Sequence, residues 1–267
     1  MKELIVRGIS GVLYITIIVF AMFASREWFL VLFFLLGVLT LHEFQKLVHL
    51  KSYFSYLIFA GLFYFFGYQV IDTNPIYLYA ILVLFVNLFL LKDLLVTSKI
   101  PMFEKKKYIT LIFYIIAGFV FLALIPFRNG IFSPEIIVGI FILIWVNDSF
   151  AYLIGKNFGK HKLLERISPK KTREGFLGGF FATLIAGFFI FKYEKNLGLG
   201  IWISLAIIVS ILGTCGDLIQ SKFKRQAGVK DSGTLIPGHG GIYDRLDSVV
   251  YVSPFIYSFL EIVAYVS

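Results

Sequence analysis

Long apolar runs that recur along the chain are the feature that most limits its fold. A helix needs about 20 mostly apolar residues to cross ~30 Å of hydrocarbon, and only helices and closed barrels satisfy every backbone group there. The short alternating segments of a barrel are absent, so the sequence predicts an all-α polytopic integral membrane protein. We expect about nine transmembrane helices, covering roughly residues 9–24, 28–41, 53–71, 76–91, 108–125, 135–154, 175–191, 199–216 and 248–266.

The distribution of basic residues predicts how these spans are oriented. If the N-terminus and the loop after every second span share one side, that side holds 21 of the 25 lysines and arginines, and the other side holds four. Cytoplasmic loops carry an excess of Lys and Arg. We therefore expect an integral protein of the inner (cytoplasmic) membrane, with the N-terminus cytoplasmic and the C-terminus outside. The apolar run 9–24 is long for a signal peptide and lacks a clean cleavage site, so we interpret it as the first span.

We divide the chain into two regions near residue 130. Residues 1–130 are expected to hold about five transmembrane helices, and residues 131–267 a transmembrane catalytic region with cytoplasmic loops 155–175 and 217–247. The basic stretch PMFEKKK fits a purely topogenic role. The net charge of +9 is explained by topology and a charged substrate, so we expect no nucleic-acid partner.

The first polar loop, NDSFAYLIGKNFGKHKLLERISPKKTREGFLGG, covers residues 147–179. Asp148 lies near the end of a span, where an acid is costly and usually faces a partner or a watery cavity. It is either a functional group or one half of a structural ion pair. The SPKKT turn offers flexible cations suited to phosphate, although a solvated basic loop would look the same. Its candidate substrate-binding residues are Lys170, Lys171 and Thr172. We expect the three glycines within 175–179 to serve close helix packing.

The second polar loop places several acids at helical spacing. Asp217 and Ser221 are four residues apart and share a face if the preceding span continues as a helix, as does Lys224. Asp244 and Asp247 are three apart and share a face if the last helix begins near Tyr243.

Three acids amid basic residues predict a divalent cation site. Mg²⁺ prefers few carboxylates and completes its shell with waters and substrate phosphates. The alternatives are structural: Asp244 suits a helix cap, Asp244 with Asp247 resembles a capping box, and His239 fits a turn. A loop of about 31 residues with this density of polar groups favours function over a simple connection.

The stretch SKFKRQAGVKDSGTLIPGHGGIYDRLD resembles the signature of phosphatidate cytidylyltransferases, also called CDP-diacylglycerol synthases. The matching positions are Ser221, Lys224, Arg225, Lys230, Asp231, Pro237, His239, Gly240, Gly241, Asp244, Arg245 and Asp247. The SPKKT–EG–GG stretch and Asp148 with AYLIGKNFGK are also similar to the family, so the resemblance covers about the C-terminal half. Gln220 stands where the family often has glutamate, and Arg173 where it often has tryptophan. An acid at residue 220 therefore cannot be essential to this chain's metal site.

The resemblance implies Mg²⁺-dependent transfer of CMP from CTP to phosphatidic acid, giving CDP-diacylglycerol and pyrophosphate in phospholipid biosynthesis. Its implied catalytic residues are Asp217, Asp244, Lys224 and Arg225. Its implied metal ligands are Asp217 and Asp244, with Asp148 and Asp247 behind them, for Mg²⁺ alone or with a second cation. Its implied substrate-binding residues are Ser221, Lys230, Asp231, His239, Arg245, Lys170, Lys171 and Thr172.

The expected partners are CTP, phosphatidic acid and membrane lipid, and the glycine-rich helix faces favour a homodimer. Three other classes compete with this interpretation. A CTP-dependent lipid or polyprenol kinase would also need a basic loop, but would release CDP. A CDP-alcohol phosphatidyltransferase would carry a DG-x2-AR pattern that the sequence lacks. A membrane transporter would place charges within its spans and often show repeated halves, whereas these spans are nearly free of charge.

Overall fold

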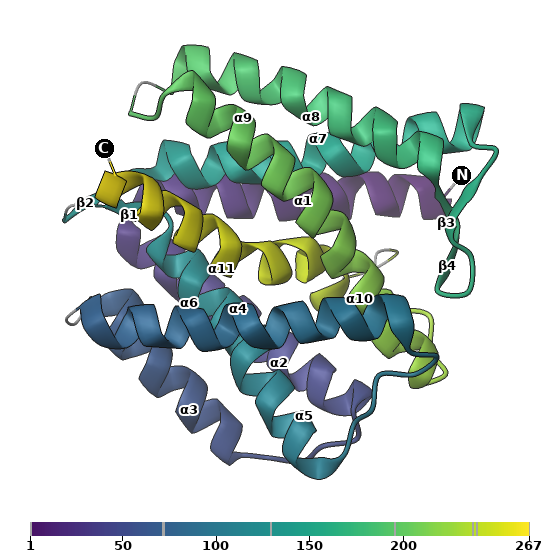
Figure 1. Ribbon diagram of the computed structural model, residues 1–267, viewed down its shortest axis with the longest axis horizontal. Coiled ribbons are helices and arrows are strands. Elements are labelled where there is room, and N and C mark those ends of the chain that lie inside the picture. Colours follow the sequence, from purple (N-terminus) through teal and green to yellow (C-terminus); the bar gives the residue numbers. More distant parts are fainter. Residues whose placement is uncertain are drawn as a thin grey trace.

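Helices make up nearly all of the regular structure, as expected for an all-α membrane protein (Figure 1). The computed structural model describes residues 2–70, 73–128, 130–194, 196–236, 238 and 240–266. The helices are α1 (Lys2–Ala24), α2 (Arg26–Leu47), α3 (Phe54–Leu62), α4 (Thr73–Val96), α5 (Glu104–Thr110), α6 (Ala117–Leu124), α7 (Pro134–Phe158), α8 (Arg173–Tyr193), α9 (Leu199–Ile208), α10 (Thr214–Gln226) and α11 (Tyr243–Val266). π-Helical segments continue α3 (Phe63–Tyr68), join α5 to α6 (Leu111–Ile116) and join α9 to α10 (Val209–Gly213).

Within the described ranges, seven helices are long and apolar enough to cross a membrane. They are Arg26–Leu47, Asn74–Val96, Glu104–Leu124, Pro134–Phe158, Arg173–Tyr193, Leu199–Gln226 and Tyr243–Val266. Two further apolar helices, Ser10–Ala24 and Phe54–Tyr68, are shorter. Each predicted span overlaps one of these helices, so the helical segments are confirmed, while the number that cross the membrane stays a prediction.

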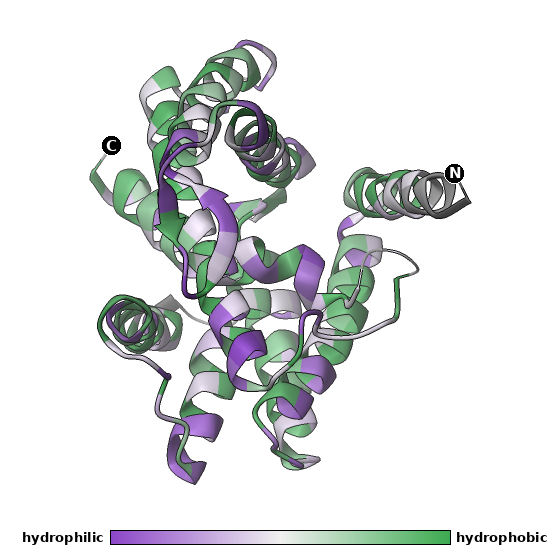
Figure 2. Cartoon of the chain, turned by 90° about the vertical axis from the view of Figure 1, so that its right-hand side faces the viewer, coloured by the Kyte–Doolittle hydropathy of each residue, from purple (hydrophilic) through white to green (hydrophobic). Residues whose placement is uncertain are grey.

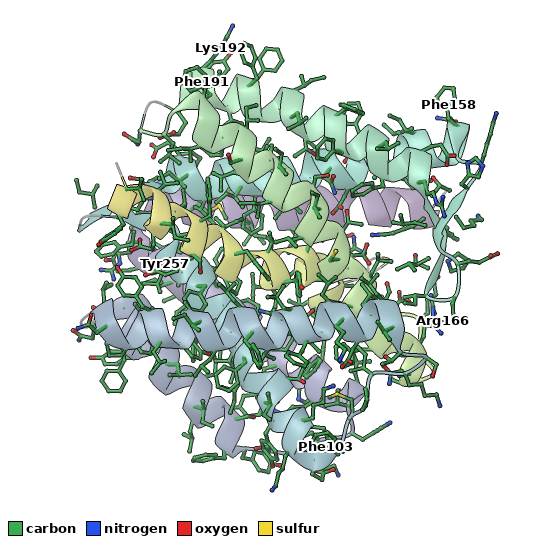
Figure 3. All side chains as sticks on the ribbon, in the orientation of Figure 1. Phe103, Phe158, Arg166, Phe191, Lys192 and Tyr257 are labelled. Carbon is green, nitrogen blue, oxygen red and sulfur yellow. The ribbon has the colours of Figure 1, made fainter. Side chains whose placement is uncertain are left out.

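The outside of the helix assembly is apolar. On α4, for example, the side chains of Leu78, Ile81 and Phe85 are 61%, 64% and 59% exposed. Figure 3 shows such side chains projecting outward along the helices. Figure 2 shows mainly hydrophobic helices with hydrophilic residues at their ends and on a hairpin near the viewer. An apolar surface of this extent on membrane-length helices is a lipid-facing surface.

Two small hairpins mark opposite ends of the molecule (Figure 1). The antiparallel strands β1 (Phe127–Arg128) and β2 (Ile131–Phe132) lie at the end that carries the C-terminus. The antiparallel strands β3 (Lys162–Leu164) and β4 (Ser168–Thr172) lie at the end that carries the N-terminus.

The SPKKT segment is therefore a strand, and its prediction as a short turn was wrong. It forms β4, in which Ser168 pairs with Leu164 and Thr172 pairs with Lys162. Pairing satisfies backbone groups that a bare loop would leave to water.

The helix formed by residues 104–124 is the centre of the packing. In its most apolar stretch 72% of the residues are buried, against 28–50% in the corresponding stretches of the other six long helices. α11 crosses it so closely that a Cβ on Gly118 would lie 2.5 Å from the backbone oxygen of Val250. The last helix is thereby fixed to the N-terminal half of the chain.

α7 and α8 lie side by side over their length, because α8 presents glycines to α7 (Figure 1). A Cβ on Gly175 would meet the backbone oxygen of Ala151 at 2.6 Å, and one on Gly179 would meet that of Asn147 at 2.7 Å. A Cβ on Gly178 would meet Ile154 at 2.3 Å. The prediction that these glycines serve helix packing is confirmed, and the close approach sets where the β3–β4 hairpin begins and ends.

The Gly118→Ala substitution should weaken the contact between α6 and α11. The added methyl meets backbone that cannot rotate away, so we expect a loss of about 1–3 kcal/mol in the free energy of unfolding. Thermal unfolding in detergent measures this loss. Gly61→Ala on α3 is the matched control, since nothing lies within 4 Å of its Cβ position. Equal melting temperatures for the two variants would contradict the packing argument.

Candidate active site

A cavity of about 710 Å³ opens at the end of the molecule that carries the β3–β4 hairpin. It lies between α7, the hairpin, the start of α8, α10 and the start of α11. Its lining residues are Asn147, Asp148, Ala151, Tyr152, Gly155, Lys156, Lys162, Leu163, Pro169, Lys170, Lys171, Thr172, Phe176, Thr214, Asp217, Lys224, Asp231, Asp244, Arg245 and Asp247. Six basic side chains and five carboxylates thus face one space, beside the apolar side chains of Tyr152, Leu163 and Phe176.

Both polar loops singled out in the sequence contribute to this cavity. The predicted site residues that line it are Asp148, Lys170, Lys171, Thr172, Asp217, Lys224, Asp231, Asp244, Arg245 and Asp247. Four predicted residues are not among the lining residues. Ser221 is buried on α10, Arg225 is exposed on the same helix, Lys230 is exposed on the loop, and His239 lies outside the described residues.

Asp217 is the acid that α10 presents to the cavity. One carboxylate oxygen forms an ion pair with Lys171 Nζ at 2.5 Å, and the other accepts a hydrogen bond from the Ser221 hydroxyl at 3.2 Å. The helix does continue past the span, so the predicted shared face of Asp217 and Ser221 is confirmed. Burial lowers the pKa of Lys171, but the carboxylates of Asp217, Asp148 and Asp247 more than offset this, and its pKa lies above the ordinary value. Lys171 is therefore a permanent cation at neutral pH.

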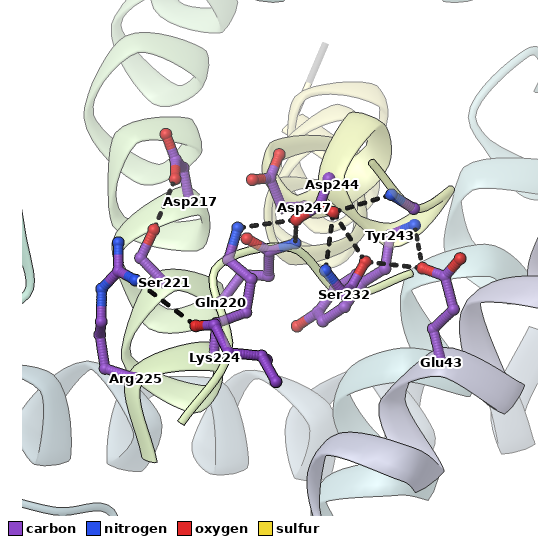
Figure 4. A network of polar contacts seen from close by, with 12 residues as sticks. Glu43, Asp217, Gln220, Ser221, Lys224, Arg225, Ser232, Tyr243, Asp244 and Asp247 are labelled. Atoms are coloured by element: carbon purple, nitrogen blue, oxygen red, sulfur yellow. Dashed lines mark hydrogen bonds and ion pairs between the residues drawn. The ribbon is translucent and has the colours of Figure 1, made fainter. Parts of the chain in front are cut away.

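Asp244 is the most highly connected carboxylate of the site (Figure 4). Oδ1 accepts hydrogen bonds from Gln220 Nε2 at 2.9 Å and Lys224 Nζ at 2.7 Å. Oδ2 accepts from the Ser232 backbone N–H at 2.8 Å, the Ser232 hydroxyl at 3.0 Å and the Gly241 backbone N–H at 2.9 Å. Asp244 therefore ties α10 and the loop to the first turn of α11.

This geometry bears on the structural alternatives for Asp244, the helix cap and the capping box. α11 begins at Tyr243, so Asp244 and Asp247 do share a helix face, and both line the cavity. The Asp244 carboxylate accepts from the preceding loop and from α10, and Asp247 Oδ1 accepts from the next backbone N–H, of Ser248, at 2.8 Å. Asp244 thus holds the loop, and the capping-box interpretation was wrong.

The carboxylates can be tested against the predicted Mg²⁺. Within the described residues, no group of three or more His, Cys, Asp or Glu side chains is arranged to hold a metal ion. Asp148, Asp217 and Asp247 nevertheless line one cavity. Mg²⁺ binds through one or two carboxylates, with waters and substrate phosphates as its other ligands. The donor set fits Mg²⁺ of that kind, and Asp244 fits it only if it gives up some of its five hydrogen bonds.

Thr172 and Arg225, two further predicted site residues, make hydrogen bonds with backbone groups. The Thr172 hydroxyl accepts a hydrogen bond from the Gly175 backbone N–H at 3.1 Å and caps α8. Arg225 donates to the backbone oxygens of Ile167, at the turn of the hairpin, and of Val229, each at 3.4 Å.

A buried lysine that the sequence did not single out fixes α10. Lys222 is 2% exposed, and its ammonium donates to the backbone oxygens of Asp93 at 2.5 Å and Thr97 at 2.8 Å. These carbonyls end α4, where a cation complements the helix dipole. Gln226 adds hydrogen bonds to the backbone N–H and C=O of Ile100, at 3.1 and 2.9 Å. α10 is held at this end by the segment that follows α4.

Sequence reasoning also missed two cavity lysines and one acid. Lys156 and Lys162 line the cavity. The available signal was the basic stretch in which they lie, since Lys156 belongs to AYLIGKNFGK and Lys162 follows it by two residues. Glu43 on α2 is 3% exposed and accepts a hydrogen bond from the Ser232 hydroxyl at 2.7 Å. Its signal was an acid near the end of an apolar predicted span, where an ionisable residue is a candidate functional group.

The fold and the cavity define a class of protein. It is a helical membrane protein with a cavity at one end that is lined by cations and carboxylates. The chain belongs to the cytidylyltransferase family, whose model matches residues 5–263. This confirms the resemblance at the level of the family over nearly the whole chain.

Several curated relatives are named phosphatidate cytidylyltransferase. The chain is 49% identical to those of Staphylococcus aureus and Staphylococcus haemolyticus over 115 residues, and 46% identical to that of Staphylococcus epidermidis over 116 residues. In each case the match covers 43% of this chain and 44% of the relative. The chain thus spans less than half the length of the relatives it matches.

The Asp244→Ala substitution should be strongly destabilising. It leaves the Lys224 ammonium, whose side chain is 12% exposed, without its carboxylate, and breaking such a pair costs about 3–5 kcal/mol. The double variant with Lys224→Met should lose less free energy of unfolding than the two single variants lose together, because it leaves no unpaired charge. Chemical unfolding in detergent measures all three variants. Asp231→Ala, at an exposed cavity position, is the control. If Asp231→Ala lowered the free energy of unfolding as much as Asp244→Ala, the role of Asp244 in holding the loop would be contradicted.

Proposed function

We propose that the protein is a phosphatidate cytidylyltransferase, which transfers CMP from CTP to phosphatidic acid. The observation that carries the proposal is the cavity, where six basic side chains and five carboxylates meet the apolar side chains of Tyr152, Leu163 and Phe176. Both substrates are polyanions and one is a lipid, so their site needs cations, carboxylates and an apolar wall at a membrane surface. The name of the staphylococcal relatives supports the same reaction.

In the proposed reaction, a phosphate oxygen of phosphatidic acid forms a bond to the α-phosphorus of CTP. The bond from that phosphorus to the bridging oxygen breaks, and pyrophosphate leaves with its electron pair. The lipid phosphate is already anionic at neutral pH, so no strong general base is needed. The protein would then contribute in-line positioning and charge neutralisation.

The cavity offers residues for each of these tasks. Lys170 and Lys171 on β4 and Arg245 on α11 would bind phosphates, with Lys156 and Lys162 beside them. Ser221 would orient the Asp217 carboxylate through its hydrogen bond. Arg225 would act through the hairpin turn that it contacts.

We assign the Mg²⁺ ligands to Asp217, with Asp148 and Asp247 beside it. Asp217 lines the cavity, where its carboxylate pairs with Lys171 and accepts a hydrogen bond from the Ser221 hydroxyl. When bound, Mg²⁺ would neutralise charge that develops on the leaving pyrophosphate. Asp244 would keep the loop in place and thereby hold Lys224 at the cavity wall.

We also propose that nine helices cross the inner membrane and that the cavity faces the cytoplasm. The distribution of 21 basic residues on one side and four on the other supports this orientation. The N-terminus and the β3–β4 hairpin share one end of the molecule, and the C-terminus lies at the other, which agrees with an odd number of spans (Figure 1).

Purified protein mixed with CTP, phosphatidic acid and Mg²⁺ tests the reaction. We expect equal amounts of pyrophosphate and CDP-diacylglycerol, and a rate about 100-fold or more lower for Asp217→Asn. Lys105→Gln, on the basic stretch away from the cavity, is the control and should keep the wild-type rate. Melting temperatures show whether each variant is folded.

Two outcomes would overturn the proposal. Release of CDP together with a phosphorylated lipid would identify a lipid kinase. Absence of turnover with CTP and phosphatidic acid, in protein that melts cooperatively, would exclude the cytidylyltransferase reaction.

Single cysteines test the orientation in sealed right-side-out vesicles, in a Cys215→Ser background. Lys192→Cys should react with a membrane-impermeant maleimide directly, because Lys192 lies in the last turn of α8, on the predicted outer side. Lys160→Cys, between α7 and the hairpin, should react only after detergent is added. The reverse pattern would contradict the orientation.

A further inference from the structure

The loop between α10 and α11 lies in the middle of the signature, and we call it the signature loop. Glu43 reaches into this loop from the N-terminal half of the chain (Figure 4). It lies on α2, and its side chain is almost fully buried. Oε1 accepts a hydrogen bond from the backbone N–H of Ile242 at 3.0 Å. Oε2 accepts from the backbone N–H of Tyr243 at 2.9 Å and from the Ser232 hydroxyl at 2.7 Å.

These contacts cap a helix across a very long stretch of sequence. The first N–H groups of a helix have no partner within the helix, and Tyr243 is the first residue of α11. A carboxylate at that position forms strong charge-assisted hydrogen bonds and complements the helix dipole. Glu43 supplies this cap from 200 residues away. It therefore sets where α11 begins and how its first turn is oriented.

Glu43 is also linked directly to the anchor of the site. The Ser232 hydroxyl lies 2.7 Å from Glu43 Oε2 and 3.0 Å from Asp244 Oδ2, so its one proton is shared between the two acids and this side chain lies between them. Asp244 in turn accepts from Lys224. A displacement of Glu43 would thus reach Asp244 through one intermediate side chain and Lys224 through two.

Two glycines of the loop are explained by this carboxylate. A Cβ on Gly233 would lie 2.5 Å from Glu43 Oε1, and one on Gly241 would lie 2.3 Å from Glu43 Oε2. Gly241 belongs to the PGHGG segment of the signature. Any side chain at either position would occupy the space of the Glu43 carboxylate, so the loop backbone is built to enclose it.

The contacts of the neighbouring residue fix α2 at the same place. The ring of Phe44 packs edge-on against Tyr243 and Phe223, with ring centroids 6.0 and 5.3 Å apart. Phe44 therefore holds α2 against the first turn of α11 and against α10. This contact fixes the distance from which Glu43 reaches the loop.

We propose that Glu43 is a positioning residue for nucleotidyl transfer. It holds Ser232, Ile242 and Tyr243, and through Ser232 and Asp244 it sets the position of the reacting side of the cavity. The kinetic part of this inference rests on the proposed function. Its structural part, the order of the loop and of the start of α11, does not.

Glu43→Gln is the first test, with Gln45→Ala as the matched control. The glutamine keeps the shape but replaces one acceptor oxygen with a donor facing a backbone N–H. Gln45 is a buried polar residue of the same helix, and its hydrogen bonds go to Ser52 and Ser55, away from the signature loop. Both variants remove buried hydrogen bonds of α2, so both should lower the melting temperature.

Only Glu43→Gln should change the loop and the reaction. We expect kcat to fall by roughly 10- to 100-fold, while KM for CTP changes less than about threefold because the phosphate-binding lysines of the hairpin are untouched. Hydrogen exchange at the amides of Ile242 and Tyr243 should accelerate in Glu43→Gln and stay at the wild-type rate in Gln45→Ala. Wild-type kcat in a folded Glu43→Gln variant would overturn the proposal, and so would unchanged exchange.

A double-mutant cycle tests whether Gly233 acts through Glu43. Gly233 is not among the glycines with a left-handed backbone, so alanine there is strained only by its neighbour. Gly233→Ala should lower kcat about tenfold or more in the wild-type background, and less than about twofold when Glu43→Ala has emptied the space. Equal losses in both backgrounds would refute the link.

The exchange measurement also separates the two proposals. It uses the intact protein in detergent without CTP or lipid. If the wild-type protein fails to make CDP-diacylglycerol while the amides still depend on Glu43, the proposed function is wrong and the positioning of the loop stands.

Discussion

The hydrogen bonds to the Asp244 carboxylate hold together the parts of the site that come from different helices. Gln220 and Lys224 reach it from α10, and Ser232 and Gly241 reach it from the loop. Asp244 itself lies in the first turn of α11. A buried carboxylate is stable only when it is paired and hydrogen-bonded, so burial of Asp244 favours the arrangement that supplies these donors. Ser232 and Gly241 thereby tie the polar loop to the helix assembly.

The opposite wall of the cavity is fixed by a different interaction, the contact between α7 and α8. Glycines on α8 let the two helices approach until backbone meets backbone. The β3–β4 hairpin connects them at that closest approach, and so it presents Lys171 to Asp217 and places Lys170 at the cavity. The wall formed by α10 and α11 is thus held by charge-assisted hydrogen bonds, and the wall formed by α7 and α8 by close packing. The basic side chains and the carboxylates face each other in the cavity between the two walls.

Local spacing in the sequence predicted much of this arrangement. The apolar runs gave the helices, the four-residue spacing gave the contact of Ser221 with Asp217, and the three-residue spacing placed Asp244 and Asp247 on one face. The same reasoning could not assign partners across the chain. The role of Lys222 depends on the end of α4, and that of Asp244 on Ser232 and Gly241. The strand at SPKKT was missed because only its pairing with β3, and no alternation of its own, makes it a strand.

The cap that Glu43 provides for α11 has a consequence for how the protein is assembled. The residues of the signature lie within the C-terminal half, but the acceptor for the first N–H groups of α11 lies on the second helix of the chain. A fragment that begins after residue 130 would contain the signature and still lack this acceptor. The half that carries the signature is therefore not a transplantable module. During biosynthesis the cavity can be completed only after the last helix has emerged and met a helix made at the start, so the complete site forms late, as a product of whole-chain assembly.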